Sequence, residues 1–221
     1  SIGFEEQEYN ELPYARMDQM ASERMWTAPA PVSYAREALA EGLLLQRRLG
    51  VNPFAFGLVA ATDTHLATPG NVDEDRFVGH AAGTVSARLE VPPLPDRLDF
   101  NPGGLTVLWA EENSRESLWR SMKRREAYAT SGTRPVVRFF GGFDVPEDMC
   151  RKGNFPAKGY AGGVPMGGTM PPLPAQSLKQ PTFAVSAVSD PGWTGNPGTK
   201  LQQAQVIKGW VDSTGKTYEK V

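Results

Sequence analysis

The chain has 221 residues, which is long enough to bury a hydrophobic core in one large domain or two small ones. Its formal net charge of −2 argues against a nucleic acid as the main partner, because binding a phosphate backbone requires a basic surface. Cys150 is the single cysteine, so the sequence excludes an intrachain disulfide, a CxxC redox motif and a zinc ribbon.

The hydropathy pattern predicts no membrane span. The most apolar candidate, residues 39–49, is interrupted by Glu41 and by Arg47 and Arg48. The opening segment is polar from Phe4 onward, which is not typical of a signal peptide. We therefore expect no membrane partner, and a chain without disulfides suits either the cytoplasm or the periplasm.

The first predicted helix spans residues 34–49. Ser33 can cap its first turn, apolar residues recur at near-helical spacing, and Gly50 stands where a glycine often ends a helix. The apolar run 56–61 follows after a short turn and is too short for a helix, so it predicts a buried strand. A helix followed closely by a buried strand is typical of an α/β layer.

A second strand and helix follow a loop-like stretch, 70–104, that is rich in proline and glycine. Residues 104–110 predict another buried strand, which leads directly into a helix. Asn113 and Glu116 have the spacing of a capping box at the helix start. The apolar face of this helix is marked by Leu118, Trp119 and Met122.

The composition changes after about residue 133, where short strand-like runs alternate with segments rich in glycine and proline. The predicted strands are 136–140, 182–188, 204–212 and 217–221. They predict an antiparallel β module of sandwich type, and we place the domain division between 1–133 and 134–221. The glycine-rich run 162–168 lacks both the Gly-Lys-Ser/Thr sequence and the helix pattern of a phosphate-binding loop.

Asp63 and His65 follow the apolar run 56–61. Two residues apart on an extended chain, their side chains leave the same face, and at the carboxyl end of a parallel strand this face looks toward the ligand-binding crevice. A carboxylate and a neutral imidazole are suitable ligands for Zn, Mn or Fe, and they also suit an acid–base couple. A hydrogen-bonded structural histidine is the third reading of this spacing.

Three further residues are candidate catalytic groups, each with a simpler alternative. His80 lies in a predicted loop, either solvated or at the rim of an active site. Glu111 lies between a strand end and a helix start, where it either stabilises the helix dipole or takes part in catalysis. Arg115 either belongs to a solvated helix face or meets an anionic ligand.

A second hypothesis rests on the tryptophans of the β module. Trp193 lies in a glycine- and proline-rich segment and could form a platform for a sugar, whereas Trp210 lies in a strand pattern that favours core packing. This reading makes the chain a non-catalytic, β-rich module that binds a glycan or a partner protein.

Several long motifs carry a resemblance to a known family. The segments "FGLVAATDTHLATPGNVDEDRFVGH", "NPGGLTVLWAEENSRESLWRSMKRREAYATSGTRPVVRFFGG", "GVPMGG" and "PGTKLQQAQVIKGWVD" resemble the C-terminal half of a large bacterial family of domains of unknown function. That family is similar to the PHP (polymerase and histidinol phosphatase) superfamily of metal-dependent hydrolases.

The resemblance implies a fold and an activity. It implies the C-terminal part of a PHP-like β/α barrel in 1–133, followed by a β-sandwich-like module in 134–221. Asp63 and His65 match the Asp-x-His metal ligands at a late strand of the superfamily. The implied activity is hydrolysis of a small phosphate-type or related ester by a metal-activated water, with divalent Zn, Mn or Fe as cofactor.

The resemblance also implies that the site is incomplete. Members of the superfamily supply an early His-x-His pair and further ligands, and a chain with two histidines cannot do so. We therefore expect the isolated chain to be inactive, to bind metal weakly, and to associate with a missing N-terminal half or with a second copy as a homodimer.

Overall fold

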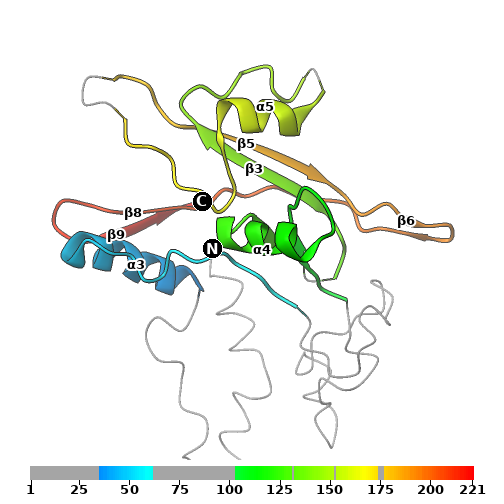
Figure 1. Cartoon of the computed structure of the whole chain (residues 1–221), viewed down its shortest axis with the longest axis horizontal. Helices are drawn as coiled ribbons and strands as arrows, with labels where there is room; N and C mark the ends of the chain where they lie inside the picture. Colours follow the sequence, from blue (N-terminus) through cyan, green and yellow to red (C-terminus); the bar gives the residue numbers. More distant parts are fainter. Residues whose placement is uncertain (1–34, 62–102, 131, 152, 174–176) are drawn as a thin grey trace, which may run out of the picture. The chain divides into compact units, whose positions relative to one another are not determined.

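The computed structural model describes residues 35–61, 103–130, 132–151, 153–173 and 177–221. Their contacts group them into two compact units, one made of 35–56 and 203–221 and the other of 57–61 and 103–202 with its gaps (Figure 1). Residues on both sides of position 133 belong to the second unit, and the domain division between 1–133 and 134–221 stays a prediction.

The first unit contains helix α3 (Ala35–Leu49), which confirms the helix predicted for 34–49. Gly50 follows the helix with a φ of 74°, a left-handed conformation that glycine adopts without steric cost. Its N–H donates to the carbonyl of Gln46 at 2.9 Å, so the end of the helix is closed as the sequence predicts.

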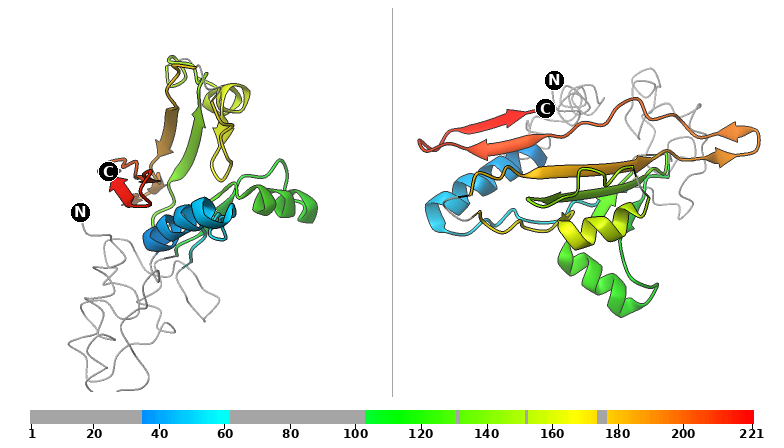
Figure 2. Two further views of the ribbon diagram at one scale, coloured as in Figure 1. Left: turned by 90° about the vertical axis from the view of Figure 1, so that its left-hand side faces the viewer. Right: turned by 90° about the horizontal axis from the view of Figure 1, so that it is seen from above.

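Strands β8 (Lys208–Val211) and β9 (Thr217–Lys220) form an antiparallel hairpin alongside α3 (Figures 1 and 2). The Asp212 carboxylate organises the turn, because it accepts hydrogen bonds from the N–H groups of Thr214 at 2.8 Å and Lys216 at 3.0 Å. The hydrogen bond from the Thr214 hydroxyl, together with these backbone bonds, lowers the pKa of Asp212 to about 2. Arg47 of α3 donates to the carbonyls of Asp212 and Ser213, so the turn is tied to the helix.

The second unit begins with strand β1 (Thr106–Leu108), helix α4 (Arg115–Arg124) and strand β2 (Ala127–Ala129). β1 and β2 pair in antiparallel register, so this strand and helix do not form the parallel layer that the sequence predicts. The reason lies at Arg125, whose φ of 61° reverses the chain at the end of α4 and returns it directly beside β1.

The prediction of a buried strand at 56–61 is wrong. These residues are largely exposed and form no strand. The Thr106 hydroxyl donates to the Ala60 carbonyl at 2.8 Å, which holds the segment next to β1. An apolar run becomes a buried strand only if a neighbouring strand pairs with its backbone and other elements cover its side chains. Among the described residues, this segment has the side-chain bond from Thr106 and no ladder of backbone hydrogen bonds.

The largest sheet has the order β4–β3–β5 and consists of β3 (Val136–Gly142), β4 (Val164–Pro165) and β5 (Thr182–Val188). Helix α5 (Phe155–Gly162), which the sequence did not predict, packs against it (Figure 2). The core of the described residues is the cluster Phe140, Met149 and Ala184, with the half-buried Val145 and Phe155 packed around it.

The described strands form small antiparallel sheets. A hairpin of β6 (Gly192–Trp193) and β7 (Asn196–Pro197) completes the second unit. The strands predicted at 136–140, 182–188 and 217–221 are confirmed, and that predicted at 204–212 is shorter. The described part of the chain is thus a β-rich mixture of helices and strands without a closed barrel, and the barrel and the sandwich stay predictions.

Gly159 of α5 provides a test of this packing, because a Cβ at this position would overlap the ring of Phe140. In an exposed helix a change from glycine to alanine is stabilising. Here we expect Gly159→Ala to lower the free energy of unfolding by about 1–3 kcal/mol, as measured by urea denaturation. Gly209→Ala is the control, since its Cβ would make only an ordinary contact, 3.9 Å from the Tyr218 carbonyl oxygen. In the Phe140→Leu background the effect of Gly159→Ala should shrink, and an equal effect there would contradict the proposed overlap.

Candidate functional site

The structure describes two of the five predicted site residues. Asp63, His65 and His80 lie outside the described residues. Glu111 precedes helix α4, and Arg115 is the first residue of that helix. Within the described ranges, no group of three or more His, Cys, Asp or Glu side chains could hold a metal ion.

Helix α4 begins one residue later than the predicted capping box. The N-cap is Ser114, whose extended backbone turns its side chain onto the first turn, and its Oγ accepts from the N–H of Ser117 at 3.3 Å. Ser114 also donates to Glu112 at 2.8 Å. Glu116 does not return to Asn113 as a capping box requires, and instead lies 3.7 Å from Arg120 as an exposed ion pair.

The Glu111 carboxylate is held at the helix start by Ser117. The buried Ser117 hydroxyl accepts from the N–H of Glu111 at 3.1 Å and donates to its Oε2 at 2.8 Å. Arg124 adds an ion pair at 3.2 Å. The hydrogen bond from Ser117, followed by the backbone N–H and Arg124, lowers the pKa of Glu111 below its ordinary 4.5. Glu111 is therefore ionised at neutral pH, which favours helix stabilisation over proton donation.

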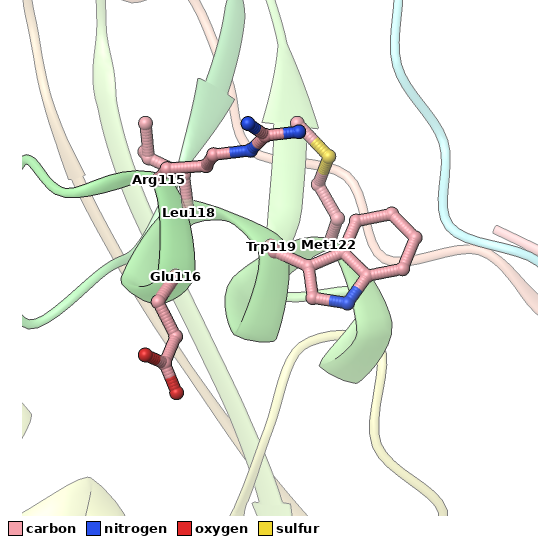
Figure 3. Close-up of a pocket in the computed structure, with 5 residues that line it drawn as sticks. All are labelled: Arg115, Glu116, Leu118, Trp119 and Met122. Atoms are coloured by element: carbon pink, nitrogen blue, oxygen red, sulfur yellow. The ribbon is translucent and has the colours of Figure 1, made fainter.

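Arg115 borders an open hollow of about 660 Å³ on the outer side of α4. The hollow is lined by Arg115, Glu116, Leu118, Trp119 and Met122, and Figure 3 shows the Glu116 carboxylate pointing away from the Arg115 guanidinium. Trp119 is 58% and Met122 52% exposed, so the apolar face predicted from these residues is not a core face.

The buried face of α4 is made of serines. Ser117 and Ser121 are both fully buried, and Ser121 donates to the carbonyl of Glu126 at 3.3 Å. Small hydroxyl side chains suit this buried face because they form hydrogen bonds with backbone groups near the two ends of the helix, the N–H of Glu111 and the carbonyl of Glu126. A pattern of apolar residues could not reveal this face.

The two described candidates, Glu111 and Arg115, border different hollows. Glu111 borders a different hollow of about 480 Å³, lined by Glu111, Glu112, Ser117, Arg120 and Arg124. Asp63 and His65 lie outside the described residues, so a site that combines them with Glu111 or Arg115 stays a prediction.

The structure contains a buried polar network that the sequence did not predict. Glu126 is only 3% exposed, and its carboxylate accepts a hydrogen bond from the Tyr160 hydroxyl of α5. Arg124 lies 3.4 Å from its other oxygen. Arg138 of β3 donates to the Tyr160 hydroxyl at 2.8 Å, and its guanidinium lies 3.3 Å from the ring centroid of Trp109.

This network joins α4, β2, β3 and α5 through one buried carboxylate. Burial, and then the bond to Glu126, raises the pKa of Tyr160 above its ordinary 10.0, so the hydroxyl keeps its proton and donates it. The Arg124 guanidinium compensates the carboxylate directly, as a buried charge requires, and Arg138 donates to the Tyr160 hydroxyl that bonds to it. Glu126 and Tyr160 are 34 positions apart, and no local pattern signals their contact.

One family model matches the chain over residues 4–221, and the family is described as Protein of unknown function (DUF3604). No curated protein and no solved structure matches the chain. No helix in the described ranges is both long and apolar enough to cross a membrane.

Ser117→Ala tests the role of Glu111. We expect the pKa of Glu111, followed by NMR titration of its side-chain carboxyl, to rise toward 4.5 in this variant. Because the folded-state pKa is lowered, ionised Glu111 contributes stability that is present above pH 4.5 and is lost as the pH falls through the lowered value. The variant should lose part of this acid dependence. Ser121→Ala is the matched control, and an equal change in both variants would exclude the specific bond.

Glu126→Gln tests the buried network. The amide removes the charge that Tyr160 faces, so we expect the pKa of Tyr160 to fall while burial keeps it above 10.0. Ultraviolet titration of tyrosinate, with Tyr160→Phe to assign the signal, measures the change. A raised tyrosine pKa contributes stability that is present below pH 10.0 and lost as the pH rises through the raised value. The exposed Glu147→Gln is the control, and an unchanged Tyr160 titration in Glu126→Gln would rule out the coupling.

Proposed function

Because the chain belongs to the DUF3604 family over residues 4–221, which contain all of its predicted metal ligands, we propose that it is part of a metal-dependent hydrolase. The substrate class is a small phosphate-type or related ester. The observation that carries the proposal is the Asp63–His65 pair, which follows a segment held beside β1 through the bond from Thr106 to Ala60.

Asp63 and His65 would bind a divalent ion of the Zn, Mn or Fe type through a carboxylate oxygen and a ring nitrogen. When bound, such an ion supplies a water whose pKa is lowered toward neutrality and a Lewis acid for the ester. The donor set fits one side of such a site. The described residues offer no cluster to complete it, and the remaining ligands of the proposed site would come from outside them.

The PHP-like barrel and the β-sandwich-like module are also part of this proposal. A PHP-like β/α barrel would place Asp63 and His65 at the end of a late strand, with α4 as the final barrel helix. The antiparallel pairing of β1 with β2 is the feature that this arrangement must accommodate. The β-sandwich-like module would be built around the β4–β3–β5 sheet.

The roles of the other candidates follow from their surroundings. Arg115 is exposed beside the apolar hollow, where it could meet an anionic ester. Glu111 is ionised at neutral pH, and its lowered pKa also makes it a weak proton acceptor, so its surroundings favour helix stabilisation over acid–base catalysis. His80 stays a candidate for the rim of the site.

A non-catalytic binding module is the second candidate function. Trp193 is 69% exposed on the β6–β7 hairpin, and an exposed indole is a platform for a sugar or a partner protein. This reading needs no metal, so binding should survive chelation and the loss of His65. Polysaccharide binding in EDTA that is lost in Trp193→Ala and kept in His65→Ala would favour it.

Asp63→Asn and His65→Ala in the parent protein test the hydrolase. We expect each to lower metal affinity by roughly 100-fold or more, since loss of even an outer-shell partner costs 10–100-fold. Ester hydrolysis should fall in parallel. Metal analysis after dialysis and turnover of aryl phosphate, phosphodiester and sulfate esters measure both quantities.

Asp75→Asn serves as the control for removal of a nearby acid. Unchanged metal content and unchanged turnover in Asp63→Asn and His65→Ala would overturn the proposal. For the isolated 221-residue chain we expect no turnover and little retained metal, because zinc sites keep at least three protein ligands. A monomer that retains metal tightly would show that the chain completes the site alone.

A further inference from the structure

One face of the β8–β9 hairpin gathers aromatic and basic side chains. In the register of the hairpin, Lys208 is opposite Lys220 and Trp210 is opposite Tyr218. Side chains two residues apart on a strand share a face, so all four belong to one face. We call the set Lys208, Trp210, Lys216, Tyr218 and Lys220 the aromatic–lysine face.

The aromatic–lysine face lies opposite to α3. Glu219 alternates to the other face, where its carboxylate lies 3.1 Å from Arg36 of α3. Val211 and Thr217, also on that other face, are half-buried. All members of the aromatic–lysine face are exposed, so the helix covers one side of the hairpin and leaves the other open.

The charges of this face are not compensated within the described part of the chain. Lys208 and Lys220 are directly opposite each other, and like charges in this position destabilise a strand pair. No carboxylate of the described residues pairs with these lysines or with Lys216. Of the acids nearest in sequence, Glu219 pairs with Arg36, and Asp212 already accepts from two backbone N–H groups and from the Tyr218 hydroxyl at 2.9 Å.

The lysines and the rings form a layered arrangement. The rings of Trp210 and Tyr218 stack with centroids 5.5 Å apart and planes at 13°. The ammonium group of Lys208 lies 5.2 Å from the Trp210 centroid, and that of Lys216 lies 5.2 Å from the Tyr218 centroid. These cations rest on flexible, exposed stems, so they can move from the rings to an incoming anion.

We propose that the aromatic–lysine face binds an acidic polysaccharide, such as a chain of uronic acid units. The carboxylates of the ligand meet the lysines, and the apolar faces of its sugar rings pack on Trp210 and Tyr218. A membrane is a poorer match, since the two rings are the only apolar groups on this face. A nucleic acid is a poorer match because proteins that bind its backbone neutralise more phosphates than the three lysines of this face can contact.

Calorimetric titration of the full chain with an oligogalacturonate tests the proposal. Its methyl ester of the same length is the neutral ligand control, and a single-stranded oligothymidylate tests a nucleic acid. We expect binding of the oligogalacturonate that weakens with added salt, and markedly weaker binding of the other two.

Lys208→Gln combined with Lys220→Gln should weaken oligogalacturonate binding by roughly 10-fold or more, because each change removes a charge-assisted contact. Lys123→Gln combined with Lys200→Gln removes the same charge elsewhere and should leave the affinity within about two-fold. Circular dichroism checks that both variants fold. Trp210→Phe, which keeps an aromatic ring, should weaken binding less than Trp210→Ala.

Three results would overturn the proposal: no binding of the oligogalacturonate, equal binding of its methyl ester, or unchanged affinity in the Lys208/Lys220 variant. Tighter binding of the oligothymidylate would replace it with a nucleic-acid surface. The proposal is independent of the hydrolase, because Asp63→Asn and His65→Ala should leave this binding unchanged. The two proposals can therefore fail separately.

Discussion

The second unit depends on the chain reversal at Arg125. A non-glycine residue with a φ of 61° closes α4, and its N–H bonds to the carbonyl of Met122 at 2.9 Å. The reversal sets β2 beside β1 and delivers Glu126 into the interior, where α5 and β3 meet it through Tyr160 and Arg138. Gly167, with a φ of 80°, packs directly on the backbone of Arg125, and any side chain there would collide with its carbonyl.

Arg124 connects the two ends of α4 electrostatically. Its guanidinium lies 3.2 Å from Glu111, which precedes the helix, and 3.4 Å from the buried Glu126, which follows it. The exposed Glu111 pair is screened by water and contributes little, whereas the Glu126 carboxylate has no such screening and depends on its partners. The polar groups around the two ends of this helix thus serve mainly to hold α4 in place.

Local signals of the sequence were the most reliable guide to this fold. Gly50 marks the end of α3, and the β-branched runs mark β3 and β5, because each of these signals acts within a few residues. The segment 56–61 was misread because apolar character says nothing about the neighbours a strand needs. Helix α5 was missed because its glycines hide the helical pattern, yet Gly159 is required where the helix crosses the Phe140 ring.

Only those candidate site residues that lie within one short motif could be predicted from the sequence. Asp63 and His65 stand two positions apart and could be proposed from sequence, although they lie outside the described residues. Glu111 and Arg115 were placed correctly at a strand–helix junction, but their separation into two hollows depends on the direction each side chain takes. Contacts such as that between Glu126 and Tyr160 arise from tertiary packing, which no short window contains.

The order β4–β3–β5 leaves one long side of β5 without a partner among the described residues. This edge strand has seven residues, Thr182–Val188, and none is charged or proline. Unpaired N–H and C=O groups along such an edge form a template for strand addition by another chain. Pro181 and Asp190 bracket the segment as gatekeepers but do not interrupt it. The bare backbone groups of this edge therefore create a site for pairing with another strand, which a covering segment would have to block.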